Sequence, residues 1–423
     1  MFVSFSVSNF GPFPGTVGIN TICDTTKKEF LEDNTFSVGT KRYNRVTYVY
    51  GFNGSGKSNI FKALLTMKQM LALSPIIATN NQQILDSVNI KDEVNAPRNF
   101  FKFNDSHKDK PTVFAIEFII DEVLYSYSFE VLNKKIASEI LSKKSKRREI
   151  ILNRTSADYN DIVLKGEFSS FDQNKNVVKE DVLCLSMAMF LNNALANKIY
   201  KEIDDIIVMN MAAFSGFQIT DEDITEESLN QYTKFLKLAD STIKEIKISL
   251  KKDEINSKIK LGSDFESREF VVQKIQVAVD SIHSIYKDRK VVGDLKLPFL
   301  QYESNGTVKM FGILPAIFRT LENGGVLFVD EIENGLHPNL TKKIVDLFNS
   351  KNSNPKNAQL ICTSHETLLL NGDIRRDQVW FLHKNNYGES KIERLSEFPN
   401  IRISDNIAKK YLNDAFGKIP NME

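Results

Sequence analysis

The octapeptide Gly51-Phe-Asn-Gly-Ser-Gly-Lys-Ser58 constrains the fold of this 423-residue chain more than any other segment. It fits the pattern G-x-x-x-x-G-K-[ST], in which glycines let backbone N–H groups wrap a phosphate at the start of a helix. A β-branched and aromatic run, 45–50, precedes it, and apolar residues at helical spacing follow between Ile60 and Leu71. This order of strand, glycine loop and helix predicts a P-loop α/β domain.

The side chains of this loop have separate expected roles in binding a nucleoside triphosphate. Lys57 is long enough to reach the β- and γ-phosphates, and the hydroxyl of Ser58 is a ligand for Mg²⁺. We therefore predict ATP and Mg²⁺ as cofactors, while the pattern leaves the preference for ATP over GTP open. The loop residues predicted to contact the nucleotide are Asn53, Gly54, Ser55, Gly56, Lys57 and Ser58.

The segment 326–331 (VLFVDE) has four apolar residues followed by two acids, which is typical of a buried parallel strand. Residues just after such a strand lie at the carboxyl edge of the sheet, where ligands of open α/β sheets bind. We expect Asp330 to hold Mg²⁺ through water and Glu331 to orient and deprotonate the attacking water. Without the P-loop, a strand that ends in two solvated acids would be the simpler interpretation.

Two weaker motifs accompany this pair. A Ser-x-Gly-Thr turn at 304–307 opens a helical stretch, and a helix N-terminus of this kind is a second anion site. Because the P-loop already accounts for one set of phosphates, we expect Ser304, Gly306 and Thr307 to serve a second subunit; a plain helix cap is the alternative. His365 follows a short apolar run and is expected to sense the γ-phosphate, with a structural hydrogen-bonding role as the alternative.

The chain as a whole is predicted to have three parts. Residues 1–180 contain the P-loop and, over 111–131, two alternating segments typical of an antiparallel β-subdomain. Residues 181–295 are predicted to form an inserted helical lobe. Residues 296–423 return to an α/β pattern, so the head is expected to be built from both ends of the chain. The helices of the lobe are expected over 183–209, 227–249 and 266–287.

Composition and charge argue against several classes of protein. The net charge is +1, so we expect no global attraction to nucleic acid or membranes. The three cysteines form no Cys-x-x-Cys pair, which argues against a disulfide framework or structural zinc and favours the cytoplasm. No segment approaches the ~20 apolar residues that span a bilayer, so no membrane part is expected. The basic run 143–148 leaves nucleic-acid binding open, although a solvated loop is the simpler interpretation.

The order of the four motifs resembles that of the ABC-type ATPase heads of the SMC, RecF and OLD group. The P-loop with Asn53, the turn 304–307, the segment 330–338 (DEIENGLHP) and the tail 411–420 (YLNDAFGKIP) are similar to stand-alone OLD-like ATPases of bacterial anti-phage and abortive-infection systems. In that group ATP lies between two heads. The resemblance therefore implies at least a homodimer, in which the turn 304–307 faces the γ-phosphate bound by the partner head.

This resemblance implies an ATPase that acts as sensor or scaffold and controls a separate effector, a toxin or nuclease, in anti-phage defence. The stretch 366–423 contains no Asp-x-Asp pair and is too short for the Toprim domain of OLD nucleases, so we expect such an activity on another polypeptide. The alternative is a RecF- or SMC-like DNA-maintenance factor. A transporter head is disfavoured because the turn lacks the Leu-Ser-Gly-Gly-Gln form. The sequence fixes neither the trigger, nor the effector, nor the number of subunits, and neither Gln82 nor Gln83 is a clear Q-loop glutamine.

Overall fold

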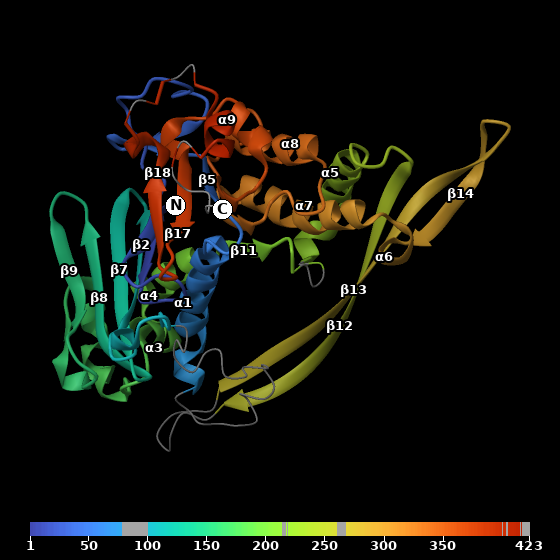
Figure 1. Cartoon of the computed structure of the whole chain (residues 1–423). Coiled ribbons are helices and arrows are strands. Elements are labelled where there is room, and N and C mark those ends of the chain that lie inside the picture. Colours follow the sequence, from blue (N-terminus) through green and yellow to red (C-terminus); the bar gives the residue numbers. More distant parts are fainter. Residues whose placement is uncertain are drawn as a thin grey trace.

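The computed structural model describes residues 1–77, 100–213, 217, 219–259, 268–399, 401–402, 405–414 and 416, with the backbone alone given for 222, 251–259 and 268–276. Over these residues the chain forms a mixed α/β structure with four sheets (Figure 1). Gln82 and Gln83, and the end of the tail 411–420, lie outside the described residues. No described helix is both long enough and apolar enough to cross a membrane.

A six-stranded sheet forms the centre of the head, and its first five strands are parallel while the last is antiparallel. One strand comes from residues 46–51 and four come from residues after 325, while the strand at 207–210 lies within the segment that the sequence predicts to be an inserted helical lobe. In spatial order they are β11 (Ile207–Asn210), β15 (Val326–Asp330), β16 (Gln359–Thr363), β5 (Val46–Gly51), β17 (Val379–Lys384) and β18 (Ser390–Arg394).

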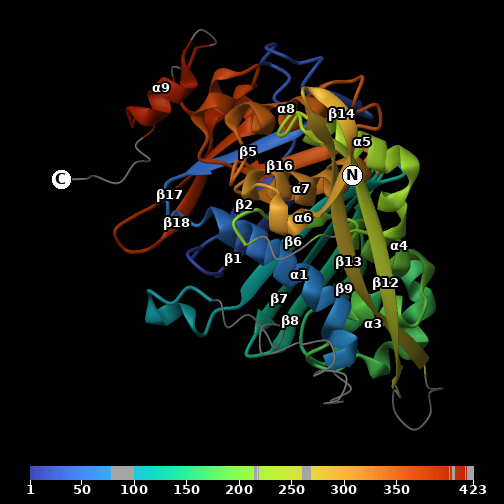
Figure 2. The same ribbon diagram turned by 90° about the vertical axis from the view of Figure 1, so that its right-hand side faces the viewer.

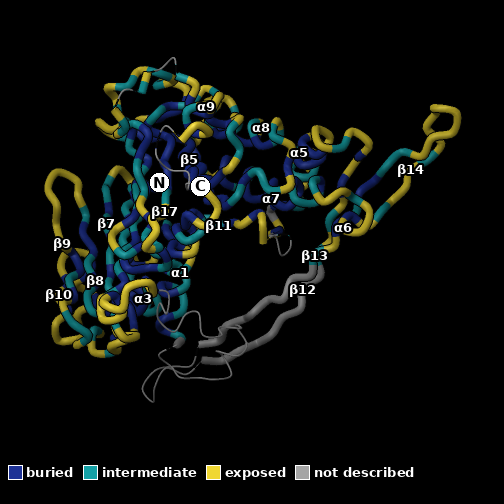
Figure 3. The backbone as a smooth tube through the Cα atoms, viewed as in Figure 1, coloured by how far each residue is buried: buried dark blue, intermediate teal, exposed yellow. Residues whose placement is uncertain are grey.

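Successive side chains along a strand point to opposite faces of the sheet. Both faces of this sheet are buried against other elements, so neighbouring residues belong to different cores. Phe328 of β15 belongs to the core on one face and packs edge-on against Phe61 of helix α1 (Lys57–Ile77), with ring centroids 5.3 Å apart. Its neighbours Leu327 and Val329 belong to the core on the opposite face. That second face is covered by α7 (Asn305–Asn323) and α8 (Pro338–Asn349). The continuous apolar runs of the sequence are thus explained by burial on both sides, and the fully buried strand β5 is dark blue in Figure 3.

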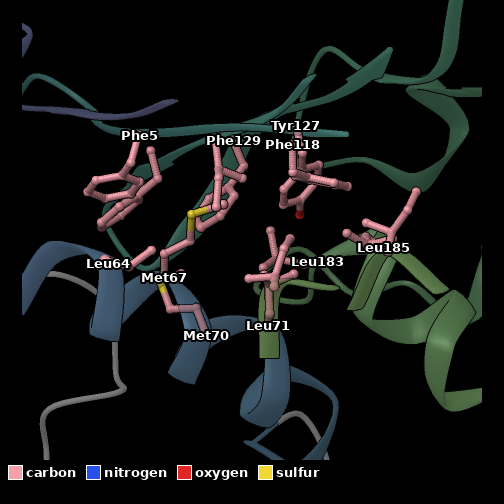
Figure 4. Packing of buried hydrophobic residues seen from close by; sticks show 14 of the residues in the cluster. Phe5, Leu64, Met67, Met70, Leu71, Phe118, Tyr127, Phe129, Leu183 and Leu185 are labelled. Carbon is pink, nitrogen blue, oxygen red and sulfur yellow. The ribbon is translucent and has the colours of Figure 1, made fainter. Parts of the chain in front are cut away.

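A seven-stranded antiparallel sheet packs on the other side of α1. Figure 4 shows Phe5 and Phe129 of this sheet directed toward Leu64 and Met67 of the helix. The pairing of β6 with β7 confirms the hairpin predicted over 111–131. In spatial order the strands are β10 (Ile162–Leu164), β9 (Arg148–Arg154), β8 (Lys135–Lys144), β7 (Val123–Leu132), β6 (Thr112–Ile120), β1 (Phe2–Ser8) and β2 (Val17–Asn20).

The prediction of a helical lobe over 181–295 is wrong for its second half. Helix α5 (Glu226–Leu236) ends well before residue 249, and the predicted helix at 266–287 is a strand. Residues 243–259 and 268–298 form a three-stranded antiparallel sheet, which we call the ribbon. Its β13–β14 hairpin projects away from the body in Figure 1, and Figure 2 shows β12 and β13 side by side. The ribbon consists of β12 (Ile243–Ile259), β13 (Arg268–Lys287) and β14 (Lys290–Pro298).

The reason for this error lies in the residue types. Apolar residues of 266–287 recur at three- and four-residue intervals, which is the helical spacing, but most of them are valine or isoleucine. These β-branched side chains are stiff in a helix and fit a pleated surface better. The pairing partners that decide the outcome lie on β12 and β14. The expected helix at 183–209 is also divided, into α3 (Cys184–Phe190), α4 (Ala194–Asp204) and the strand β11.

The remaining elements are short. They are β3 (Thr35–Val38), β4 (Lys41–Asn44), α6 (Phe299–Tyr302), α9 (Ile407–Leu412), and the 3₁₀ helices Asp105–His107, Tyr159–Asp161, Gly166–Val177, Asp221–Ile224, Thr367–Asn371, Arg376–Gln378 and Leu395–Glu397.

Candidate active site

The P-loop connects the end of β5 to the start of α1, as the sequence predicts. Gly54 and Gly56 have φ values of 77° and 106°, which side-chain-bearing residues rarely adopt. At Gly56 a Cβ atom would also lie 2.8 Å from Cγ of Pro12, so the position has no room for a side chain. Asn53 and Gly54 are exposed at the crest of the loop, and Ser58 is half-buried in the first turn of α1. The loop thus presents backbone amides beside a helix N-terminus.

Lys57 lies against its own loop, where it donates hydrogen bonds from Nζ to the carbonyls of Gly51 at 2.7 Å and Phe52 at 3.2 Å. Lys57 is only 6% exposed to solvent. Burial lowers its pKa to about 8, against the opposing attraction of Asp330 and Glu331. A polyanion at the loop would offset this desolvation, so the site favours binding of negative charge.

Asp330 and Glu331 lie at the carboxyl end of β15, which is separated from the P-loop strand by β16. Asp330 is 1% exposed, and its carboxylate accepts hydrogen bonds from Thr363 Oγ1 at 2.6 Å and Asn210 Nδ2 at 3.0 Å. Asn210 and Thr363 come from the two strands that flank β15. A threonine and an asparagine at strand ends are weak sequence signals, so the sequence analysis missed both residues.

Glu331 has a φ of 53°, in the left-handed region that a residue with a side chain rarely adopts. Its backbone N–H donates to Thr363 Oγ1 at 2.7 Å, which holds the chain in this sharp turn. Its carboxylate accepts a hydrogen bond from Asn334 Nδ2 at 2.9 Å. Strained residues held by neighbouring contacts are frequent at active sites, and the contacts fix the direction of this carboxylate.

His365 follows β16 and is exposed, while its backbone N–H donates to Glu333 Oε1 at 2.7 Å. Desolvation by the surrounding protein and the positive charge of Lys57 lower the pKa of its imidazole, although the carboxylates of Glu333 and Glu331 act in the opposite direction. The imidazole is therefore neutral near pH 7 and can donate a hydrogen bond without an ionic charge. These interactions place His365 in the same electrostatic environment as the P-loop lysine.

The Ser-x-Gly-Thr turn is separate from this group. Ser304 is the N-cap of α7, and its Oγ accepts from the backbone N–H of Thr307 at 3.1 Å, which is the helix-cap arrangement. Gly306 lies against the loop after β15, where a Cβ atom would be 3.0 Å from the carbonyl oxygen of Gly335. Among the described residues, no hydrogen bond joins this turn to the P-loop. Figure 1 shows α6, which leads into the turn, beside the ribbon and well apart from the start of α1.

The residues present fit Mg²⁺ and a triphosphate. Carboxylate and hydroxyl oxygens are the ligands that Mg²⁺ prefers, and Asp330 and Ser58 supply them. Within the P-loop, the Ser55 hydroxyl is buried without a hydrogen-bond partner in the described structure, although buried polar groups are normally paired. A phosphate oxygen bound in the loop would be a suitable partner for this hydroxyl.

Comparison with known proteins places this site in a family. A family profile described as "AAA domain, putative AbiEii toxin, Type IV TA system" matches residues 46–371, which is more than half of the chain. The chain belongs to this family. It therefore has an AAA-type domain of the P-loop ATPase class, which confirms the predicted nucleotide-binding α/β domain at this level. None of the curated proteins matches the chain significantly. The matched range contains the P-loop, the two acids, the Ser-x-Gly-Thr turn and His365.

Proposed function

We propose that this chain is an ATP-hydrolysing head of the ABC type, similar to the OLD-like ATPases, that self-associates and controls a separate effector in anti-phage defence. The observation that carries the ATPase proposal is the convergence of Lys57, Asp330 and Glu331 at the carboxyl edge of the parallel sheet, where β5 and β15 end. This edge is where ligands of open α/β sheets bind.

The residues act on the γ-phosphate in complementary ways. Mg²⁺, held by Ser58 and Asp330, would neutralise charge on the β- and γ-phosphates. Glu331 accepts a proton from water, the water oxygen forms a bond to the γ-phosphorus, and the bond from the γ-phosphorus to the β–γ bridging oxygen breaks, so that ADP and phosphate leave. Lys57 stabilises the charge on the phosphate oxygens, and the neutral imidazole of His365 donates a hydrogen bond to the γ-phosphate.

A composite site between two heads is supported by the position of the turn 304–307. The turn is a helix N-terminus with exposed Ser304 and Asn305, and within the described residues it has no hydrogen bond to the P-loop of its own chain. A second copy related by two-fold symmetry can bring this turn to the P-loop. Ser304 and Gly306 would then face the γ-phosphate across the interface. Thr307 is only 2% exposed and its hydroxyl lies 2.8 Å from Ser304 Oγ, so it would support the turn from inside.

Mixing two inactive variants tests this composite site. In Lys57→Ala the P-loop is defective, and in Ser304→Arg the turn is blocked, so each variant alone should hydrolyse ATP poorly. A mixed dimer has one site with an intact P-loop and an intact partner turn. An equimolar mixture should therefore recover about a quarter of the wild-type rate if subunits exchange freely. A mixture that stays at the mean of the two variants, or a fully active Ser304→Arg variant, would contradict shared sites.

The control of a separate effector is supported by the family description, which names a toxin–antitoxin system. Tagged Glu331→Gln protein, purified from its native host with Mg²⁺ and ATP, should retain one co-purifying protein with toxin or nuclease features. The amount of this protein should fall sharply with Lys57→Ala, because that variant is expected to bind ATP about 100-fold more weakly. Recovery of DNA and repair proteins instead would contradict the effector proposal and favour the DNA-maintenance alternative. A membrane protein would favour a transporter subunit.

The alternative of DNA maintenance has one structural observation in its favour. The basic run 143–148 forms the turn between β8 and β9, and Lys146 and Arg147 are exposed there. However, Lys143 is already paired with Glu167 at 2.8 Å, so part of this charge is neutralised. Binding to phosphate backbones would have to be strongly salt-dependent.

A further inference from the structure

The ribbon leads without a loop into the turn at 304–307. Its last strand, β14, ends at Pro298, and the single helical turn of α6 follows at once. Glu303 then forms the C-cap of α6, and Ser304 forms the N-cap of α7. One residue, Glu303, therefore separates the end of α6 from the proposed phosphate-facing turn.

Glu303 lies in the connection between α6 and α7, where an exposed side chain would be expected, but its side chain is buried. This side chain is only 4% exposed and forms an ion pair with His283 of the ribbon strand β13. Its Oε1 accepts hydrogen bonds from Ser281 Oγ at 2.5 Å and His283 Nε2 at 2.8 Å, both on β13. His283 Nδ1 in turn lies 3.2 Å from Oγ1 of Thr242, just before β12. The carboxylate thus fastens the start of α7 to β13, and His283 adds a contact with the residue just before β12.

A second group of contacts connects α7 to the proposed general base. Lys309, in the second turn of α7, donates a hydrogen bond from Nζ to Oδ1 of Asn334. Asn334 donates from Nδ2 to Oε2 of Glu331 at 2.9 Å. Gly335 is packed against Lys309 so closely that a Cβ atom there would lie 2.6 Å from Lys309 Cδ. The loop that carries Glu331 is therefore held against α7 by the contacts of Lys309 with Asn334 and Gly335.

We propose that Glu303 is a positioning residue that couples the position of the ribbon to the position of α7. Through Lys309 and Asn334, α7 in turn positions the carboxylate of Glu331, so that the ribbon controls the rate of ATP hydrolysis. This inference rests on the proposed function, in which Glu331 is the general base. Chains of packed and hydrogen-bonded groups between two sites can carry coupling of this kind. The contacts from Ser281 and His283 to Glu331 provide such a set within one chain. A molecule that holds the ribbon would then change turnover without touching the nucleotide.

The test compares Glu303→Ala, Glu303→Gln and His283→Ala with wild type in full-length protein, using Mg²⁺ and ATP. Small errors in the placement of reacting groups have large effects on the chemical step. We expect Glu303→Ala to lower kcat about tenfold, while the Kd of ATP stays within about twofold, because the P-loop is untouched. Glu303→Gln keeps an oxygen acceptor for Ser281 and His283 and should restore most of the rate. A residue with a merely structural role would not separate kcat from Kd in this way.

The control is Asp294→Asn, which removes an exposed ion pair between β14 and Lys244 without contacting α7. It should leave kcat unchanged. In the double variant Glu303→Ala, His283→Ala, the two effects should not multiply, because both residues belong to one set of contacts. Multiplying effects, or a Glu303→Ala variant with the wild-type kcat, would overturn the inference. A wild-type protein that does not hydrolyse ATP would instead overturn the proposed function. If Glu303→Ala unfolds, His283→Ala decides the question, because it should also lower kcat while the Kd of ATP stays unchanged.

Discussion

Glu331→Gln should bind ATP as well as wild type and hydrolyse it at least about 100-fold more slowly, because general-base catalysis contributes at least this factor. Glutamine has the same shape and can still accept the hydrogen bond from Asn334, so the loop should keep its conformation. It cannot take a proton from water. The measurement is single-turnover hydrolysis of labelled ATP together with the Kd of ATP, which separates the chemical step from binding.

A matched control for this prediction is Glu227→Gln, which removes an exposed carboxylate on α5. It should hydrolyse ATP at the wild-type rate. Equal rates in wild type and Glu331→Gln would remove the assignment of the general base. In that case Glu333, whose Oε2 is buried without a hydrogen-bond partner in the described structure, is the next carboxylate to test. It follows Glu331 by two residues on the same loop.

Lys57→Ala should lose about 100-fold in affinity for ATP, because two charge-assisted hydrogen bonds to phosphate contribute roughly 3 kcal/mol together. The variant should not be less stable than wild type. The pKa of Lys57 in the folded chain, about 8, lies below its ordinary value of 10.5, so at pH 7 the buried charge destabilises the folded state and its removal relieves this cost. Titration with a fluorescent ATP analogue measures the affinity, and urea denaturation measures the free energy of unfolding.

Lys62→Ala provides the matched control, since Lys62 is exposed on the same helix, α1. Its affinity for ATP should equal that of wild type. A Lys57→Ala variant that still binds ATP tightly would contradict the predicted P-loop role. A variant that unfolds would instead contradict the stability argument, which follows from the burial of Lys57.

The turn at 304–307 and the ribbon show most clearly what a local sequence pattern can and cannot predict. At Ser304 the sequence predicts either a helix cap or a second anion site. The structure shows the helix cap, and the anion site stays a prediction. The helix predicted over 227–249 ends at Leu236, and the helix predicted over 266–287 is a strand, because valine and isoleucine at helical spacing also fit a strand. Local periodicity cannot distinguish the two when a chain pairs with residues far away along the sequence.

The sequence by itself determined the P-loop, the strand that ends in Asp330 and Glu331, and the order of strands and helices around them. These features depend on short-range requirements: glycines where φ is positive, a helix N-terminus beside the loop, and apolar runs that need burial on both faces. Only the tertiary structure decided which residues complete the site. Thr363 contacts Asp330 because β16 lies between β5 and β15, and Glu303 contacts His283 because the ribbon folds back on the start of α7. Such contacts depend on strand order and on pairing between distant segments, which no local pattern encodes.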